Sequence, residues 1–171
     1  MQKNYFIQSV LFFILLTLFS QFVSASEAQR PALPRPELKQ IQDLRETSRL
    51  AKTSNLPVLM MFGTDECPYC EMLREEFLIP MIISGEYRSK IIMREVHIAY
   101  DETLIDFKGK KITASQFAHR YGVTLFPTMV FIDSKGKVLV EKILGITTPS
   151  LFGGTLDSRI DEALAVLRKR S

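Results

Sequence analysis

The chain has 171 residues, of which 46% are hydrophobic and 24% charged, and its formal net charge is +3. A chain of this size and composition accommodates one globular domain with an ordinary apolar core. The charge is too small and too mixed to indicate nucleic-acid binding, and the short basic clusters at 108–111 and 168–170 are typical of a solvated loop and a helix C-terminus.

Residues 1–25 have the layout of a secretory signal peptide. Lys3 is the only charged residue in this segment, an apolar run from Val10 to Phe19 follows it, and small residues end at Ala25. We expect cleavage after Ala25 and a periplasmic mature protein. The competing interpretation is an uncleaved membrane anchor, because the run from Tyr5 to Val23 is nearly long enough to span a bilayer.

The mature chain is expected to comprise an extended, proline-containing lead-in, 26–37, and one domain, 38–171. From Leu38 to about Thr53, apolar residues recur at helical spacing among charged ones, which predicts an amphipathic helix. Val58 to Phe62 is continuously apolar and of strand length, as in a strand that is buried on both faces. We expect this strand at the centre of the sheet.

The only two cysteines follow this strand, in the run Cys67-Pro68-Tyr69-Cys70. Residues 69–78 are rich in helix formers, and Pro80 is expected to kink or end that helix. A Cys-x-x-Cys at the start of a helix places the first sulfur beside unpaired backbone N–H groups and the positive end of the helix dipole. This setting favours thiolate over thiol, so we predict Cys67 as a nucleophile.

A structural disulfide and a metal site are the alternative interpretations of the pair. A disulfide that closes so short a loop contributes only about 2 kcal/mol in the chain-entropy model, so a stabilising bridge is expected elsewhere. Zinc needs three or four ligands, and the only histidines, His97 and His119, show no ligand spacing. Copper binding by the two thiols would also need a suitably spaced His or Met. We predict no metal and no cofactor.

The rest of the domain is predicted to continue with strands and helices in turn. Ile91 to Ile98 is a predicted strand, and the polar segment 99–112 a loop or a small surface hairpin. Thr113-x-x-Gln116 is a capping box that opens a short helix ending before Gly122. Segments 128–133 and 137–144 then form an antiparallel hairpin. The last helix begins near Thr148-Pro149 and carries an apolar stripe of Phe152, Leu156, Ile160, Leu164 and Leu167.

The chain resembles the thioredoxin superfamily from Leu38 to about Lys169. Two motifs carry the resemblance: Cys67-Pro68-Tyr69-Cys70 after a buried strand, and Tyr121-Gly-Val-Thr-Leu-Phe-Pro-Thr128 before a hairpin that ends at Gly145. The resemblance implies an α/β fold with a central mixed sheet of four to five strands and helices on both faces. With its export signal and insertions, the chain is most similar to the periplasmic thioredoxin-like proteins, among them the SoxW type.

The second motif is expected to bind substrate. From the residues alone, Pro127 is either a plain trans start of a strand or a cis proline that turns the backbone of Phe126 outward. The resemblance implies the cis form, lying beside the cysteine pair. An extended substrate segment would then pair with the backbone of Phe126. The expected substrate-binding residues are Pro68, Tyr69, Phe126, Pro127 and Thr128.

One position departs from the family. Thioredoxins carry a buried aspartate on the central strand beneath the cysteines, and the matching residue here is Met61. We propose Glu95, on the neighbouring strand, as a substitute that accepts the proton of Cys70; the alternative is a solvated strand residue. His97 and His119 are interpreted as a packing or sheet-edge residue and a surface residue, and neither is assigned a catalytic role.

Together these features predict an exported thiol–disulfide oxidoreductase. Cys67 would attack a disulfide of a protein or small-molecule substrate, and Cys70 would resolve the mixed disulfide. The acidic residues Asp65, Glu66 and Glu71 oppose a thiolate nearby. This favours a reductant that is recharged by a membrane electron donor.

Two alternatives to a reductant stay open. A disulfide oxidase or isomerase belongs to the same class of enzyme. A non-catalytic binding module that holds a partner along the Phe126–Pro127 edge belongs to another class. We expect a monomer without a nucleic-acid partner, bound to the membrane only if the N-terminal segment is retained.

Overall fold

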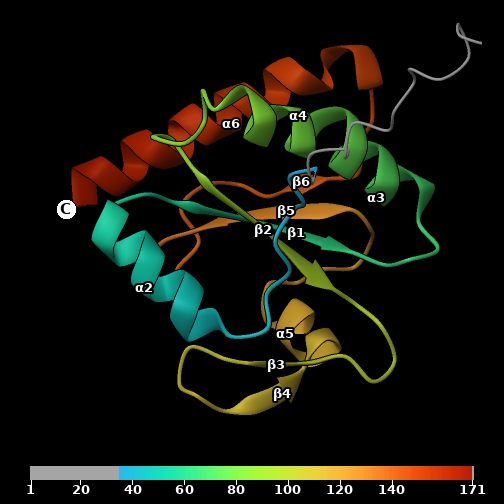
Figure 1. The fold of residues 1–171 in the computed structure, drawn as a ribbon, viewed down its shortest axis with the longest axis vertical. Coiled ribbons are helices and arrows are strands. Elements are labelled where there is room, and N and C mark those ends of the chain that lie inside the picture. Colours follow the sequence, from blue (N-terminus) through green and yellow to red (C-terminus); the bar gives the residue numbers. More distant parts are fainter. Residues whose placement is uncertain (1–34, 171) are drawn as a thin grey trace, which may run out of the picture. The chain divides into compact units, whose positions relative to one another are not determined.

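A four-stranded mixed sheet with the strand order β2-β1-β5-β6 forms the centre of the domain in the computed structural model (Figure 1). The structure describes residues 35–170, and the domain begins at Pro36. The predicted signal peptide and the lead-in as far as residue 34 lie outside the described residues. The strands of this sheet are β1 (Val58–Gly63), β2 (Ile92–His97), β5 (Thr128–Ile132) and β6 (Ile143–Leu144).

β1 is the interior strand that the sequence predicts. It runs parallel to β2 on one side and antiparallel to β5 on the other. Every residue of β1 is buried, with Leu59 and Met61 in the apolar cluster on one face and Met60 and Phe62 in the cluster on the other. A strand that contributes to two cores needs apolar residues at every position, which explains its continuous apolar run.

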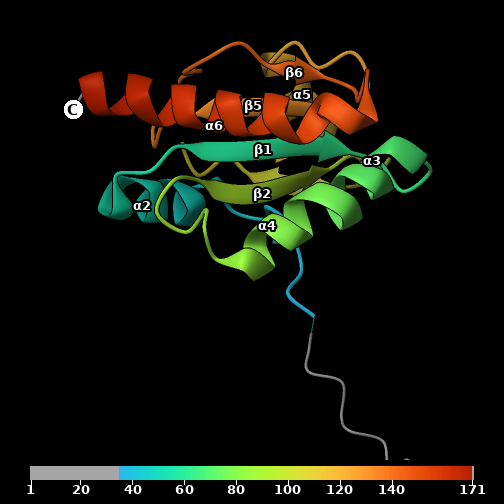
Figure 2. The same ribbon diagram turned by 90° about the horizontal axis from the view of Figure 1, so that it is seen from above.

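Helices cover both faces of the sheet (Figure 1). One face packs against α6 (Pro149–Arg170) and a continuous helical run of α3 (Pro68–Met72), η1 (Leu73–Leu78) and α4 (Ile79–Ser84). The other face packs against α2 (Leu44–Ser54) and α5 (Ala114–Arg120). Figure 2 shows α3 beside the end of β1, where the chain leaves the sheet.

The first helix begins later than predicted. The apolar spacing predicts a helix from Leu38, but α2 begins at Leu44. Asp43 is the N-cap residue, and its carboxylate accepts the backbone N–H of Arg45 at 2.8 Å. A capping aspartate satisfies an N–H group that has no partner within the helix, so the helix starts there.

The segment before this cap is extended and lies along the outer edge of β2. The N–H of Ile41 donates to the carbonyl of Glu95 at 2.7 Å, and the N–H of Glu95 donates to the carbonyl of Lys39 at 3.0 Å. Leu38 and Ile41 are buried, as they would be in the predicted helix. They belong instead to an extended segment that bridges β2 through Gln40. Two apolar residues three apart do not distinguish the two conformations.

The helix after the cysteines does not end at Pro80, one of the two outcomes that the sequence predicts there, the other being a kink. It runs to Ser84 and closes at Gly85, which has a φ of 74°. The π-helical turn η1 directly precedes α4, which has Pro80 in its first turn. Proline lacks the N–H that an α-helical bond requires, and a widened turn before it accommodates that loss.

The predicted surface segment, capping box and last helix are confirmed. Segment 99–112 contributes to a small hairpin of β3 (Thr103–Ile105) and β4 (Lys111–Thr113). Thr113 and Gln116 form the reciprocal capping box of α5. α6 begins at Pro149 and buries four of the five stripe residues, with Leu167 partly buried. The predicted second strand of the hairpin is shorter: beyond a bridge at Val138, only β6 pairs with β5.

Candidate active site

β1 delivers the cysteine pair to the beginning of α3. Cys67 is the N-cap residue of α3, with an extended backbone, and its Sγ accepts the backbone N–H of Cys70 at 3.2 Å. Pro68 takes the first helical position, where its missing N–H has no partner to lose. The local sequence thus places one sulfur among the unpaired N–H groups of a helix start.

The two cysteines differ in their access to solvent. A disulfide joins them in this structure. Cys67 is partly exposed, whereas Cys70 is 0% exposed and belongs to the apolar cluster beneath α3. A reagent in solution therefore reaches Cys67 first, which is the asymmetry that an attacking and a resolving thiol require.

Met61 occupies the position beneath the pair where the family carries an aspartate. Its side chain is fully buried. Its Cε and the Sγ of Cys70 each lie 3.2 Å from the position that a Cβ of Gly63 would occupy. The space beside the buried sulfur is thus filled by a thioether, which accepts protons poorly.

The Phe126–Pro127 peptide is cis, as the resemblance implies. Pro127 is buried, whereas Phe126 is 36% exposed. The hydroxyl of Thr128 donates to the carbonyl of Leu125 at 2.7 Å, and the N–H of Gly145 donates to the carbonyl of Pro127 at 2.8 Å. No hydrogen bond within residues 35–170 occupies the backbone N–H or carbonyl of Phe126. Hydrogen bonds therefore fix the chain at Leu125, Pro127 and Thr128, while the backbone of Phe126 is available for pairing.

Exposed apolar side chains are contributed by the two motifs and by β6. Tyr69 of α3 is 54% exposed, and Leu125 and Leu144 are 41% and 43% exposed. Leu144 of β6 pairs with Thr128 in the strand register, which brings β6 to the second motif. Sequence reasoning missed Leu125 and Leu144, because exposed leucines give no sign of function until their position in the fold is known.

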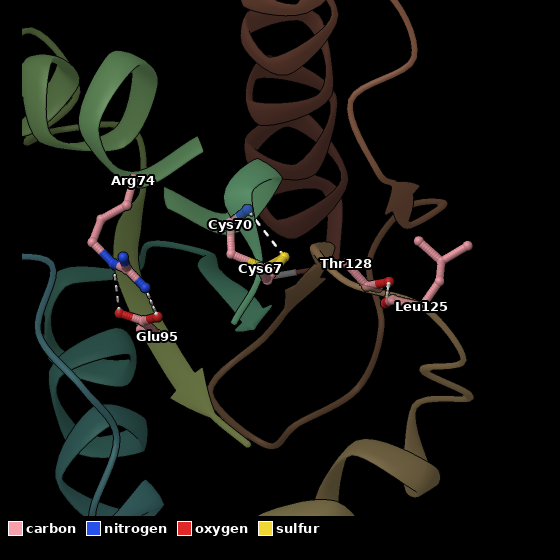
Figure 3. The surroundings of a disulfide bond; sticks show 6 residues. All are labelled: Cys67, Cys70, Arg74, Glu95, Leu125 and Thr128. Carbon is pink, nitrogen blue, oxygen red and sulfur yellow. Dashed lines mark hydrogen bonds and ion pairs between the residues drawn. A yellow bond between two sulfur atoms is a disulfide. The ribbon is translucent and has the colours of Figure 1, made fainter. Parts of the chain in front are cut away.

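Glu95 is 7% exposed, so the alternative of a solvated strand residue is wrong. It lies opposite Met61 in the β1–β2 register. Both carboxylate oxygens accept hydrogen bonds from Arg74, from Nη2 at 2.6 Å and from Nε at 3.2 Å (Figure 3). The hydrogen bond to Glu95 raises the pKa of Arg74. The proton-relay role of Glu95 stays a prediction.

Arg74 is a further residue that sequence reasoning missed. Its position four residues after Cys70, on a predicted helix, is the signal that would have placed it on the same side as the buried cysteine. In Figure 3 the Arg74–Glu95 pair lies on one side of the cysteine pair, and Leu125 and Thr128 lie on the other.

The two histidines occupy different settings. His97 is at the end of β2, and its Nε2 lies 3.3 Å from the Oδ2 of Asp65 in the loop before Cys67. His119 is exposed on α5, as predicted. Within the described part of the chain, no group of three or more His, Cys, Asp or Glu side chains is arranged to hold a metal ion. The same residues contain no helix long and apolar enough to cross a bilayer.

Several solved structures are similar to the chain. DsbH oxidoreductase is 21% identical, with coverage of 85% of this chain and 98% of that one and a TM-score of 0.49. Mitochondrial thioredoxin 3 from Saccharomyces cerevisiae is 21% identical over 70% of this chain and 94% of that one, with a TM-score of 0.46. Thioredoxin O2 from Arabidopsis thaliana is 18% identical over 72% and 95%, with a TM-score of 0.45.

A family model provides the assignment. A comparison with curated proteins found no significant match. The model described as a thioredoxin-like domain matches residues 44–159. This range is more than half of the chain and includes the cysteine pair and the cis proline. The chain therefore belongs to the thioredoxin-like domain family.

Proposed function

We propose that the protein is a thiol–disulfide oxidoreductase that acts through Cys67 and Cys70. The observation that supports this most strongly is the asymmetry of the pair, with a partly exposed sulfur at the N-cap of α3 and a fully buried one in the first turn. A bridge that only stabilised the fold would not need one exposed sulfur at a helix start.

In the reduced protein, the thiolate of Cys67 attacks one sulfur of a substrate disulfide. A mixed disulfide forms, and the other substrate sulfur leaves as a thiolate that takes a proton from water. Cys70 then loses its proton and attacks the Sγ of Cys67, which releases the second substrate thiol. Two electrons pass to the substrate, and the protein returns to the disulfide form seen in the structure. The exchange needs no cofactor.

We propose that the physiological direction is reduction. Asp65, Glu66 and Glu71 are exposed around the start of α3. Their negative charge opposes a thiolate at Cys67, so the reduced form is not stabilised in the way that makes a site strongly oxidising. A dithiol electron donor on the membrane would then reduce the protein again.

Substrate would bind along the second motif. An extended segment can pair with the backbone of Phe126, adding a temporary strand next to Cys67. Pro68 and Tyr69 from one side, and Pro127 and Thr128 from the other, would border that segment. The exposed Tyr69 ring would give apolar contact to many different peptides, which suits a protein substrate.

We also propose export to the periplasm through residues 1–25. Expression of the full chain, followed by cell fractionation and N-terminal sequencing, tests this directly. A periplasmic protein that begins at Ser26 is the expected result. A protein that stays with the membrane fraction and keeps residues 1–25 would show the anchor instead.

Reduction of insulin by dithiothreitol tests the proposed activity. The protein should accelerate the precipitation of insulin chains, and Cys67→Ser should abolish this acceleration. A binding module would give no acceleration but would still retain a peptide bearing a disulfide. An oxidase would instead speed the oxidation of a reduced, unfolded protein more than the reduction of insulin.

A further inference from the structure

An open groove of about 890 Å³ is lined by residues of the extended segment before α2, of β2 and of the helical run that follows the cysteines. Its lining includes Arg74 and Glu75 of η1, Glu95 and His97 of β2, and Asp65 of the loop before Cys67. The remaining charged side chains that line it are Glu37, Lys39, Glu46 and Glu102. The groove is thus mainly acidic, and the Arg74–Glu95 pair is part of its lining.

The pair itself is held rigidly within this acidic setting. Glu95 accepts from two nitrogens of Arg74, so the guanidinium cannot turn without losing one of the two hydrogen bonds. The side chain of Arg74 is 26% exposed and that of Glu95 is 9% exposed. Charges with so little access to water are screened weakly and act over longer distances than surface charges.

Three relationships connect this pair to Cys70. Arg74 follows Cys70 by four residues in the same helical run, which places the two side chains about one turn apart. Glu95 and Met61 are direct neighbours across β1 and β2. The Cε of Met61 and the Sγ of Cys70 converge on the Cβ position of Gly63. Met61 is therefore a neighbour both of Glu95 and of the buried sulfur.

We propose that the Arg74–Glu95 ion pair balances charge beside Cys70 and thereby holds the Cys67–Cys70 couple at a reducing potential. The inference rests on the proposed function, for which it names two positioning residues. A lone cation at this place would stabilise the thiolate and hence the reduced form, whereas a lone carboxylate would destabilise it. With both present, the two fields largely cancel.

The two single variants should change the couple in opposite directions. Glu95→Gln leaves the Arg74 cation and should make the couple more oxidising, by about tenfold in its equilibrium constant with glutathione, or about 30 mV. Arg74→Gln leaves the carboxylate and should make it more reducing by a similar factor. The double variant Arg74→Gln/Glu95→Gln should return to within about twofold of the wild-type constant.

The measurement is a redox titration in glutathione buffers at fixed pH, read out by maleimide mass tagging of free thiols, since the chain has no tryptophan. Arg94→Gln is the matched control, because Arg94 is also partly buried on β2 but donates to the carbonyl of Met93 and belongs to the opposite face of the strand. This control should leave the equilibrium constant unchanged. Arg74→Lys keeps the charge and should stay near the wild-type constant.

Removal of Arg74 alone leaves a buried carboxylate unpaired. If that variant does not fold, Glu95→Gln and the double variant still decide between the outcomes. The proposal would be overturned if the equilibrium constant changed equally in Glu95→Gln and in the double variant, or if it did not change in Glu95→Gln. An unchanged potential combined with a slower release of substrate in Glu95→Gln would overturn it too and support the proton relay. The titration reports on the cysteines whether or not the protein reduces insulin, so failure of the proposed function is seen separately.

Discussion

Gly63 and Cys70 approach so closely that a side chain at position 63 would press on the buried sulfur. The position of a Gly63 Cβ is 3.2 Å from the Sγ of Cys70 and 3.3 Å from its Cβ. Gly63 is the last residue of β1, so the end of the central strand sets how deeply the second cysteine is buried. Glycine is the residue that permits so close an approach of a backbone.

Gly63→Ala should lower the free energy of unfolding by about 1–3 kcal/mol, the usual range for overpacking a core. The methyl of Met61 can move aside, but the disulfide and the surrounding cluster hold the sulfur of Cys70. Urea unfolding followed by circular dichroism measures the difference. Gly154→Ala is the control: nothing lies within 4 Å of its Cβ position, and the change should stabilise α6 by about 0.5–1 kcal/mol. Equal effects of the two changes would contradict the packing at Gly63.

Asp106 should make stability depend on pH in the acid range. The pKa of Asp106 is held below its ordinary value, chiefly because its carboxylate accepts the backbone N–H of Lys110 and further because Arg120 and Lys108 donate to it. A lowered pKa in the folded state stabilises the fold above about pH 4, near the ordinary pKa of aspartate, and this stabilisation is lost as the pH falls through the lower value.

Asp106→Asn should therefore lower stability at neutral pH and flatten the decline of stability as the pH falls below about 4. Urea midpoints measured across this range test the expectation. Asp101→Asn serves as the control, because Asp101 is exposed in the preceding loop. A decline that is as steep in Asp106→Asn as in the wild type would show that this carboxylate is not responsible.

Much of the fold is predictable because its signals are local. The continuous apolar run of β1, the capping box of α5 and the stripe of α6 each follow from a repeating pattern of residues, and each element forms where predicted. Apolar spacing predicts too early a start for α2, because the spacing continues across Asp43 into an extended segment. The capping residue Asp43 sets the start of the helix, and the spacing of apolar residues carries no information about capping.

The site was predictable only in part. Both motifs lie where the resemblance implies, and the proline is cis. The partner of Glu95 was not predictable, because Arg74 is 21 residues away in the sequence and meets it only once α3 and η1 pack on β2. Burial of Glu95 likewise depends on the segment around Gln40, which covers the edge of that strand. Such pairings follow from the packing of elements, which periodicity does not specify.

The acidic residues next to Cys67 should keep the potential of the couple below about −150 mV, on the reducing side of the range for this kind of site. Neutralising two of them, in Glu66→Gln/Glu71→Gln, should raise the potential, and the increase should shrink at high salt because both side chains are exposed. Asp65 is left unchanged, since it also contacts His97.

A glutathione titration at low and high ionic strength makes this measurement. Glu86→Gln is the control, because it removes an exposed carboxylate just beyond α4, away from the cysteines. A wild-type potential above about −150 mV would argue for an oxidase. No difference between the double variant and Glu86→Gln would remove the acidic residues from the explanation.

Leu144 should contribute to binding of protein substrates. Leu144→Asn should raise the KM for insulin several-fold, about 1 kcal/mol of lost apolar contact, and leave the redox potential unchanged. Val138→Asn is a matched control, since both side chains are 43% exposed and only Leu144 pairs with Thr128. Steady-state kinetics of insulin reduction should therefore separate the two variants. A similar KM for both would exclude β6 from the binding surface.

The central claim is that Cys67 attacks and Cys70 resolves. It predicts that Cys70→Ser, once reduced, accumulates a mixed disulfide with a substrate, because the second thiol that would release it is absent. Cys67→Ser should accumulate none, since its remaining thiol is fully buried.

Mass spectrometry of the trapped protein, after incubation with a peptide that contains a disulfide, is the most direct test. The expected result is one peptide bound through Cys67 in Cys70→Ser and no adduct in Cys67→Ser. An adduct at Cys70 in Cys67→Ser, with none in Cys70→Ser, would contradict the assignment of the two cysteines.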